Sequence, residues 1–259
     1  MKQPRGLKVE RVEFDSYAYE YEEMVNSGIA FFGEKHDYFH AYKLSCLQRW
    51  IAGIEYSDTI LDFGCGTGKL AALMAQTFRH AAVYGYDVSS RSLELARARC
   101  GALENLTFGD SFTEHQFDLI VAANVFHHIK PKDRKRVILQ LRDSLKPTGR
   151  MVIFEHNPLN PLTRWVVKAC PFDADAELLS ALQFIRLAGS CDLEVDCRRY
   201  IVFFPKFLSF FRRLEFHLGF FPLGAQYMLS LKKGPPPEGM LEGNRSLLPG
   251  QLKNDPPGR

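Results

Sequence analysis

The sequence predicts an α/β fold in which a mostly parallel sheet carries helices on both faces. Short apolar runs alternate with stretches of helical composition along the middle of the chain, an order typical of parallel strands joined by crossover helices. A glycine-rich loop directly follows the first of these runs. The 259 residues, 46% hydrophobic and 24% charged, match the composition of an ordinary globular domain.

Seven strands are expected, each a short apolar run bounded by glycine, proline or polar residues. They cover 59–63, 82–86, 106–108, 117–122, 151–154, 195–204 and 226–231. Helices are expected where apolar residues recur at helical spacing and where capping residues or prolines mark the first turn. They cover 36–51, 69–78, 89–100, 131–145, a segment that Asn160 caps and that starts at Pro161, and 175–187.

Composition excludes several other classes of protein. No apolar run approaches the roughly 20 residues of a membrane-spanning helix, and the N-terminal sequence does not resemble a secretory signal. The net charge of +3 gives little support for a nucleic-acid partner. The six cysteines show neither a CxxC pair nor zinc-type spacing. We therefore expect reduced thiols, a cytoplasmic protein and no metal.

The loop after the first predicted strand reads DFGCGTGK over residues 62–69. A P-loop needs Ser or Thr where Leu70 stands, and the dinucleotide fingerprint needs glycine where Lys69 stands. Glycines still allow close approach of the backbone to a ligand, and the following helix N-terminus favours an anionic group. The loop therefore predicts a cofactor site of a third kind.

Residues 60–70, ILDFGCGTGKL, resemble the first motif of class I S-adenosylmethionine-dependent methyltransferases of the small-molecule branch (type 11/12-like). Four further matches follow in order along the chain. They are Tyr86-Asp87, Gly109-Asp110-Ser111, residues 117–129 and the turn at 145–150, in which Thr148 replaces a glycine of the family pattern. Together they cover roughly residues 58–156.

The resemblance implies a Rossmann-like sheet and S-adenosylmethionine as the cofactor. It places Asp87 at the ribose hydroxyls and Asp110 at the adenine amine, while the glycine loop can take the methionine carboxylate. The expected cofactor-binding residues are Asp62, Gly64, Cys65, Gly66, Gly68, Asp87, Val88, Asp110, Ser111 and Asn124. For Asp62, Asp87 and Asp110, a role confined to the loop, the helix cap or the turn is the alternative.

The same resemblance divides the chain. We expect one methyltransferase domain over 1–233, with an N-terminal helical cap at about 15–55, a cofactor-binding core at about 58–156 and an acceptor-side region at about 157–233. Residues 234–259 contain 11 Gly or Pro and few large apolar residues, so a disordered tail is expected. In the cap, Tyr38, Tyr42 or Lys43 is expected to reach the cofactor or the substrate.

Methyl transfer is an in-line displacement, so the protein has to align the reactants and remove any acceptor proton. His127 and His128 follow the fourth strand, and Glu155 follows the fifth. These three are the candidate catalytic residues, because histidine is a suitable base near neutral pH. The alternatives are packing or hydrogen bonding beside the cofactor for the histidines and orientation of a loop or substrate group for Glu155.

Eight phenylalanines fall between Tyr200 and Phe221. Three interpretations remain open: a helix packed through Phe207, Phe210, Phe211 and Leu214, a pocket for an apolar or lipid-like acceptor, or a membrane-surface contact flanked by basic residues. The expected function is methyl transfer to a small organic acceptor, at the inner face of a membrane if the contact forms.

A nucleic-acid methyltransferase and a non-catalytic S-adenosylmethionine-binding protein are the alternative functions. Against the first, residues 123–126 depart from the (N/D)PPY pattern of base methylation.

Overall fold

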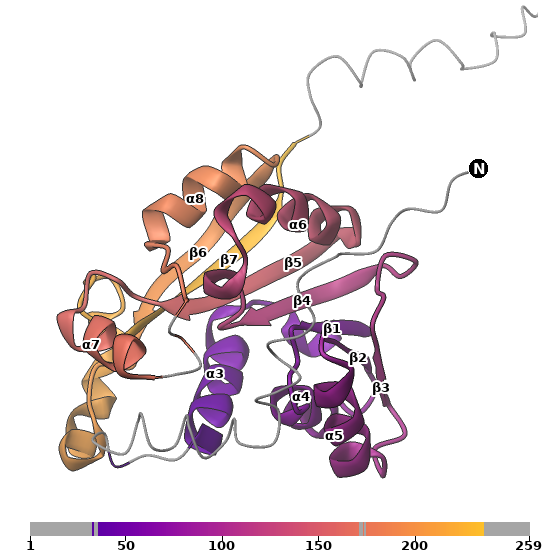
Figure 1. The fold of residues 1–259 in the computed structure, drawn as a ribbon, viewed down its shortest axis with the longest axis horizontal. Coiled ribbons are helices and arrows are strands. Elements are labelled where there is room, and N and C mark those ends of the chain that lie inside the picture. The colour runs from indigo at the N-terminus through magenta and orange to yellow at the C-terminus, as the bar shows by residue number, and fades with distance from the viewer. Residues whose placement is uncertain (1–32, 34–35, 171–172, 174, 236–259) are drawn as a thin grey trace, which may run out of the picture.

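The computed structural model describes residues 33, 36–170, 173 and 175–235. Its centre is a seven-stranded sheet with the order β3-β2-β1-β4-β5-β7-β6 (Figure 1). The strands are β1 Thr59–Phe63, β2 Ala82–Tyr86, β3 Leu106–Gly109, β4 Phe117–Ala123, β5 Leu145–His156, β6 Leu193–Ile201 and β7 Gln226–Lys233. The first five are parallel, whereas β7 runs antiparallel to both β5 and β6. The predicted sheet is confirmed.

Helices cover both faces of the sheet, as expected. They are α3 His36–Trp50, α4 Lys69–Thr77, α5 Ser90–Cys100, α6 Pro131–Asp143, α7 Pro161–Ala169, α8 Ala181–Gly189 and α9 Glu215–Leu218, with the 3-10 helices η2 Ile54–Tyr56, η3 Phe126–His128 and η5 Lys206–Leu214. In Figure 1, α6 and α8 lie above the sheet, and α3, α4 and α5 lie below it.

Successive residues of β4 show how the core is divided between the two faces. Leu119 and Val121 pack in the cluster that includes α3 and α4, whereas Ile120 and Ala122 pack in the cluster that includes α6 and α8. Neighbouring strand residues point to opposite faces of a sheet. A strand covered on both faces therefore reads as a continuous apolar run, which is why the sequence identified it.

Several boundaries differ from the prediction. The strand expected over 151–154 covers Leu145–His156 and includes the turn expected at 145–150. Two other differences have a clear local cause. The helix expected over 175–187 begins only at Ala181, because Ser180 accepts a hydrogen bond from the Gln183 amide, and the Gln183 side chain accepts from the Ser180 amide. The strand expected over 195–204 ends at Ile201, because Val202 adopts a left-handed conformation with φ 61°.

Parts of the predicted domain plan lie outside the described residues. These are the beginning of the helical cap, apart from residue 33, and the predicted tail from residue 236 onward. No helix in the described ranges is long and apolar enough to cross a bilayer.

Candidate active site

The predicted cofactor residues gather at the carboxyl ends of β1, β2, β3 and β4. The sheet order reverses between β1 and β4, because β2 and β3 lie on one side of β1 and the later strands lie on the other. Ligands of open parallel sheets bind in the crevice at such a switch point. Asp62, Asp87, Asp110 and Asn124 therefore meet at one edge although they are spread along the chain.

The glycine loop between β1 and α4 is shaped for close approach by a ligand. The amides of Gly64 and Cys65 both donate to the Tyr86 carbonyl, at 2.8 and 2.9 Å, which fixes the loop to the end of β2. A Cβ on Gly64 would lie 2.5 Å from a methyl group of Val125, so no side chain fits there. Beside Gly66, in contrast, no atom lies within 4 Å of the Cβ position. Space is therefore open at the middle of the loop.

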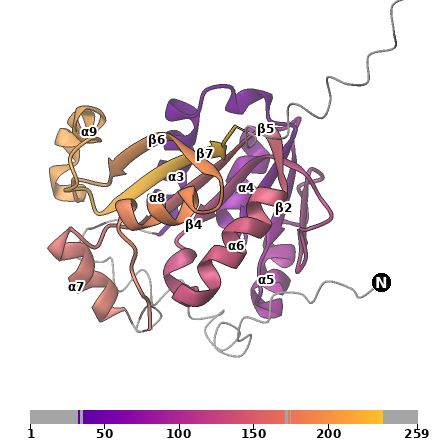
Figure 2. The same ribbon diagram turned by 90° about the horizontal axis from the view of Figure 1, so that it is seen from above.

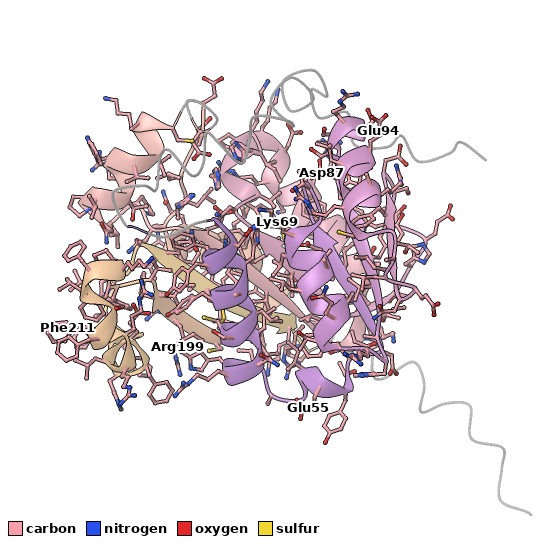
Figure 3. The ribbon with its side chains drawn as sticks, turned by 90° about the horizontal axis from the view of Figure 1, so that it is seen from below. Glu55, Lys69, Asp87, Glu94, Arg199 and Phe211 are labelled. Atoms are coloured by element: carbon pink, nitrogen blue, oxygen red, sulfur yellow. The ribbon has the colours of Figure 1, made fainter. Side chains whose placement is uncertain are left out.

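Asp87 joins the loop to the start of α5. Its Oδ2 accepts from the Gly66 amide at 2.8 Å, and its Oδ1 accepts from the Ser89 amide at 2.9 Å. A carboxylate oxygen has more than one acceptor direction. The two amide bonds fix the carboxylate and leave it able to accept further hydrogen bonds from a diol. Figure 3 shows Asp87 close to Lys69, the first residue of α4.

Two buried oxygens in the crevice need hydrogen-bond donors. In the described structure, Asp62 Oδ2 and Asn124 Oδ1 are buried without a hydrogen-bond partner. Burial, together with the charge of Asp87, raises the pKa of Asp62 to about 7. Leaving such groups unpaired costs about 1–3 kcal/mol each. A ligand that brings ammonium and hydroxyl donors would satisfy them, so the residues fit S-adenosylmethionine.

The remaining predicted cofactor residues differ in exposure. Cys65 is buried. The pKa of its thiol is raised mainly by burial and further by the charges of Asp62 and Asp87. Val88 packs beside the core cluster. Asp110 and Ser111 are exposed at the end of β3, where the Ser111 carbonyl accepts from the Tyr84 hydroxyl at 2.8 Å. Position and exposure allow all four to line a bound nucleoside.

A buried acid–histidine pair lies next to the crevice. Glu155, at the end of β5, accepts from the amides of Val125 and Phe126 at 2.9 and 2.6 Å through Oε1. Its Oε2 lies 2.5 Å from His127 Nδ1. Burial raises the pKa of Glu155, but His127, His156 and the Phe126 amide together lower it, so that the net shift is downward. Glu155 therefore orients η3 and the His127 ring.

Two more groups complete this cluster. Asp173 lies 3.5 Å from His127 Nε2 and 3.4 Å from His128 Nε2, and the His156 ring centroid is 5.1 Å from that of His127. Burial lowers the pKa of His127, yet Glu155 and Asp173 raise it to about 9. Burial and the neighbouring His127 lower the pKa of His128 to about 3. The sequence analysis missed Asp173.

Helix α3 forms another wall of the site. Lys43 is buried, and burial lowers its pKa to about 8 against the opposing effects of Glu155 and Asp62. Lys43 lies close enough to Glu155 and Asp62 for both charges to affect its pKa. This position supports the expectation that the cap reaches the cofactor region. Tyr42 instead donates to Glu215 on the acceptor side. Glu215 is a further residue that the sequence analysis missed.

An apolar cleft and an apolar surface lie together in the part of the chain that was predicted to be the acceptor side. The cleft is formed by α3, the start of α7 and the segment after β6, and its lining includes Tyr38, Phe39, Leu162, Val202, Phe203 and Phe204. Outside it, Phe207 and Phe210 are 71% and 77% exposed, and Trp165 is 59% exposed. The interpretation of Phe207 and Phe210 as a packed helix face is therefore wrong.

The middle of the chain is similar in sequence to known proteins. A family model described as methyltransferase domain matches residues 61–151. The demethylmenaquinone methyltransferase of Thermotoga maritima is 36% identical over 110 residues, which cover 40% of this chain and 45% of that protein. The cyclopropane-fatty-acyl-phospholipid synthase of Escherichia coli K12 is 33% identical over 92 residues, which cover 35% of this chain and 24% of that protein. The matched stretch thus spans less than half of either relative.

Similarity to solved structures extends over most of the fold. Magnesium protoporphyrin IX methyltransferase from Synechocystis PCC 6803, with bound SAH, aligns with a TM-score of 0.61 at 14% identity. The alignment covers 86% of this chain and 98% of that one. The protein therefore has the class I methyltransferase fold. Segment 61–151 is similar to the methyltransferase domain that the family model describes.

Proposed function

We propose that the protein transfers the methyl group of S-adenosylmethionine to a small organic acceptor with an apolar body. The crevice at Gly66 carries this proposal, because it combines an open glycine loop, a fixed Asp87 carboxylate and two buried oxygens without donors. The methyltransferase-domain match over residues 61–151 supports it. S-adenosylmethionine supplies a methyl carbon that its sulfonium activates for displacement.

The chain's own residues bind and orient the reactants. Asp87 accepts from the ribose hydroxyls, and the loop around Gly66 lies against the methionine part. Asp62 and Asn124 accept from the remaining donors. Asp110 and Ser111 lie at the adenine end. This assignment follows the order of the strand ends along the sheet edge.

His127 and His128 are the residues that meet the acceptor in this proposal. Both lie in η3 beyond β4, and Asn124, on the cofactor crevice, lies two residues before η3 begins. Glu155 is a positioning residue, because its carboxylate is occupied by two amides and by His127. The acceptor reaches them from the side of the apolar cleft between α3 and α7.

The apolar body of the acceptor follows from the surface around this cleft. Helix α7 and the η5–α9 segment lie at the same end of the molecule (Figures 1 and 2). The Asn160 side chain, which caps α7, donates to the Leu223 carbonyl at 2.6 Å and so links the two segments. Large apolar side chains are exposed on these two segments and in the loops next to them, namely Leu159, Leu162, Trp165, Phe207, Phe210, Leu214, Phe220, Phe221 and Leu223. We call these side chains the apolar end surface.

The charges around the apolar end surface favour an anionic membrane. Residues 157–170 and 202–225 contain a single acidic residue, Glu215, which is buried. The same ranges contain five basic residues other than histidine, Arg164, Lys168, Lys206, Arg212 and Arg213. Exposed aromatic residues flanked by such cations are typical of interfacial membrane binding. We infer a lipid-like acceptor, taken up from the surface of a bilayer.

The six cysteines are free thiols, the form maintained in the cytoplasm. We therefore place the proposed membrane contact at the cytoplasmic face.

Thermal unfolding with added cofactor tests the binding half of this proposal. Saturating S-adenosylmethionine should raise the melting temperature, because it binds only the folded chain. Asp87→Ala should abolish most of the shift, whereas Asp143→Ala, on the exposed end of α6, should leave it unchanged. Absence of a shift in the natural protein would contradict the proposal.

A further inference from the structure

The side chains of His127, His128 and Asp173 converge on one point beside the crevice. Each offers one ligand atom, and the three atoms all lie within 4.8 Å of one another. Asp173 Oδ1 is 3.5 Å from His127 Nε2 and 3.4 Å from His128 Nε2. Charged hydrogen bonds are normally shorter, about 2.7–2.9 Å.

These distances equal the distance expected between two ligand atoms bound to the same metal ion. Metal–nitrogen and metal–oxygen bonds of about 2.0–2.2 Å place neighbouring ligands of a tetrahedral ion roughly 3.3–3.5 Å apart. A single ion could therefore bind both imidazoles and the carboxylate with small side-chain adjustments, mostly of the two rings toward each other.

Glu155 orients the His127 ring for metal binding. Its Oε2 faces His127 Nδ1 at 2.5 Å, so the other ring nitrogen, Nε2, points toward Asp173. Metal-bound histidines usually donate their second N–H to a carboxylate, which fixes the tautomer and the ring orientation. Here the carboxylate is itself fixed by the amides of Val125 and Phe126. The arrangement of Glu155 and His127 matches the carboxylate–histidine part of a carboxylate–histidine–metal relay.

The cluster also has an accessible side. The His127 and Glu155 side chains are 1% exposed, whereas those of His128 and Asp173 are 15% and 14% exposed. Three protein ligands and one position open to solvent are the pattern of catalytic rather than structural zinc sites.

We propose that His127 Nε2, His128 Nε2 and Asp173 Oδ1 bind one zinc-class divalent transition-metal ion. Two imidazoles and one carboxylate favour such an ion over Mg²⁺ or Ca²⁺, which prefer oxygen ligands. The ion's open position would lie beside His128 and Asp173, the two partly exposed ligands. There it would bind an acceptor hydroxyl and lower its pKa, so that the proton leaves to solvent. The oxygen would then bond to the methyl carbon as S-adenosylhomocysteine leaves. This role rests on the proposed methyl transfer, whereas the site itself rests only on the cluster.

Metal titration of the full chain tests the site directly. After removal of bound metal with a chelator, one Zn²⁺ per chain should bind, as measured by calorimetry and by elemental analysis after dialysis. Co²⁺ in its place should give the visible absorption bands of a low-symmetry, nitrogen-coordinated ion. Mg²⁺ at the same concentration should produce no binding signal.

Matched variants assign the ligands. His128→Gln and Asp173→Asn conserve side-chain volume and should each weaken Zn²⁺ binding at least tenfold. His80→Gln, an exposed histidine after α4, should leave it unchanged. S-adenosylmethionine binding, measured on the same samples, shows that each variant is folded.

Two results would overturn the metal site. The first is no stoichiometric Zn²⁺ binding by the natural protein, and the second is an affinity for Zn²⁺ in both ligand variants that equals that of the natural protein. Zinc binding without any methyl transfer would instead contradict the proposed function and leave the site intact.

Discussion

Glu155 and His127 form a buried ion pair, with 2.5 Å between Oε2 and Nδ1 and side chains that are 1% exposed. The pair connects the end of β5 to the turn after β4, across the neighbouring strands that border the cofactor crevice. A buried charge whose partner is removed is strongly destabilising. The pair therefore ties the stability of the sheet edge to the geometry of the site.

Glu155→Gln should lower the free energy of unfolding by about 3–5 kcal/mol, because it removes the charge that balances His127. Urea denaturation of the two proteins measures the difference. Glu194→Gln, at an exposed pair with Lys232, is the matched control and should change stability by less than about 1 kcal/mol. Equal losses in the two variants would show that the buried pair has no special importance.

Gly64→Ala should destabilise the protein by about 1–3 kcal/mol. The new methyl group would meet Val125 at 2.5 Å, in a backbone conformation with φ 74°. Gly189→Ala, which has open space around the Cβ position, should be neutral or slightly stabilising. The double variant with Val125→Ala should recover part of the loss. Calorimetric melting of the four proteins measures these effects, and full stability of Gly64→Ala would refute the close contact.

Asp62 predicts a pH dependence in the absence of cofactor. Its pKa is 3.8 in an unfolded chain and about 7 in the folded protein, because burial and Asp87 disfavour the charge. The folded state therefore binds more protons than the unfolded state between these values. The stability contributed by this group is complete below pH 4 and is lost as the pH rises through 7.

Asp62→Asn removes this titration while conserving shape. The variant should be more stable than the natural protein at pH 8, and its advantage should shrink toward pH 5. Urea denaturation at several pH values measures the difference, with Asp58→Asn, an exposed neighbour, as the control. A stability difference that stays constant with pH would contradict the account of Asp62.

Glu215 should hold the aromatic segment after β6 in place. It accepts from the amides of Phe203 and Phe204 at 3.1 and 3.0 Å and from the Tyr42 hydroxyl. Glu215→Ala removes all three bonds and should speed tryptic cleavage after Lys206 and Arg213 severalfold. Tyr42→Phe should have a smaller effect, since it removes one bond. Unchanged cleavage in Glu215→Ala would show that the segment is held by other contacts.

The apolar end surface predicts binding to anionic vesicles. Phosphatidylglycerol vesicles should pellet the protein at low salt, and phosphatidylcholine vesicles should pellet far less, because each basic residue near an anionic surface contributes about 1 kcal/mol. Phe207→Ser with Phe210→Ser should reduce binding at least fivefold.

Tyr56→Ser is the matched control for this surface. Tyr56 is an aromatic residue that is 78% exposed in η2, and in Figure 3 its neighbour Glu55 lies apart from Phe211 of η5. The control should bind as the natural protein does. Equal binding by the phenylalanine variant would rule out the apolar end surface as the contact.

The placement of the candidate cofactor residues was predictable because each strand end carries its own candidate. Asp62 follows the run 59–61 and Asp87 follows 82–86. Asp173 and His156 were not predicted as a pair with His127, since only the folding of three separate segments brings them together.

The exposure of Phe207 and Phe210 to solvent could not be predicted from the sequence, for a different reason. Helical spacing shows which side chains share a face, but it does not show whether another element covers that face.

The most direct test of the central claim follows labelled methyl from S-adenosylmethionine into an extract of the producing cell. The product is then fractionated into lipid, nucleic acid and water-soluble small molecules. The account predicts label in the lipid fraction with the natural protein and almost none with Asp87→Ala. Label in nucleic acid, or equal incorporation by the Asp87 variant, would contradict it.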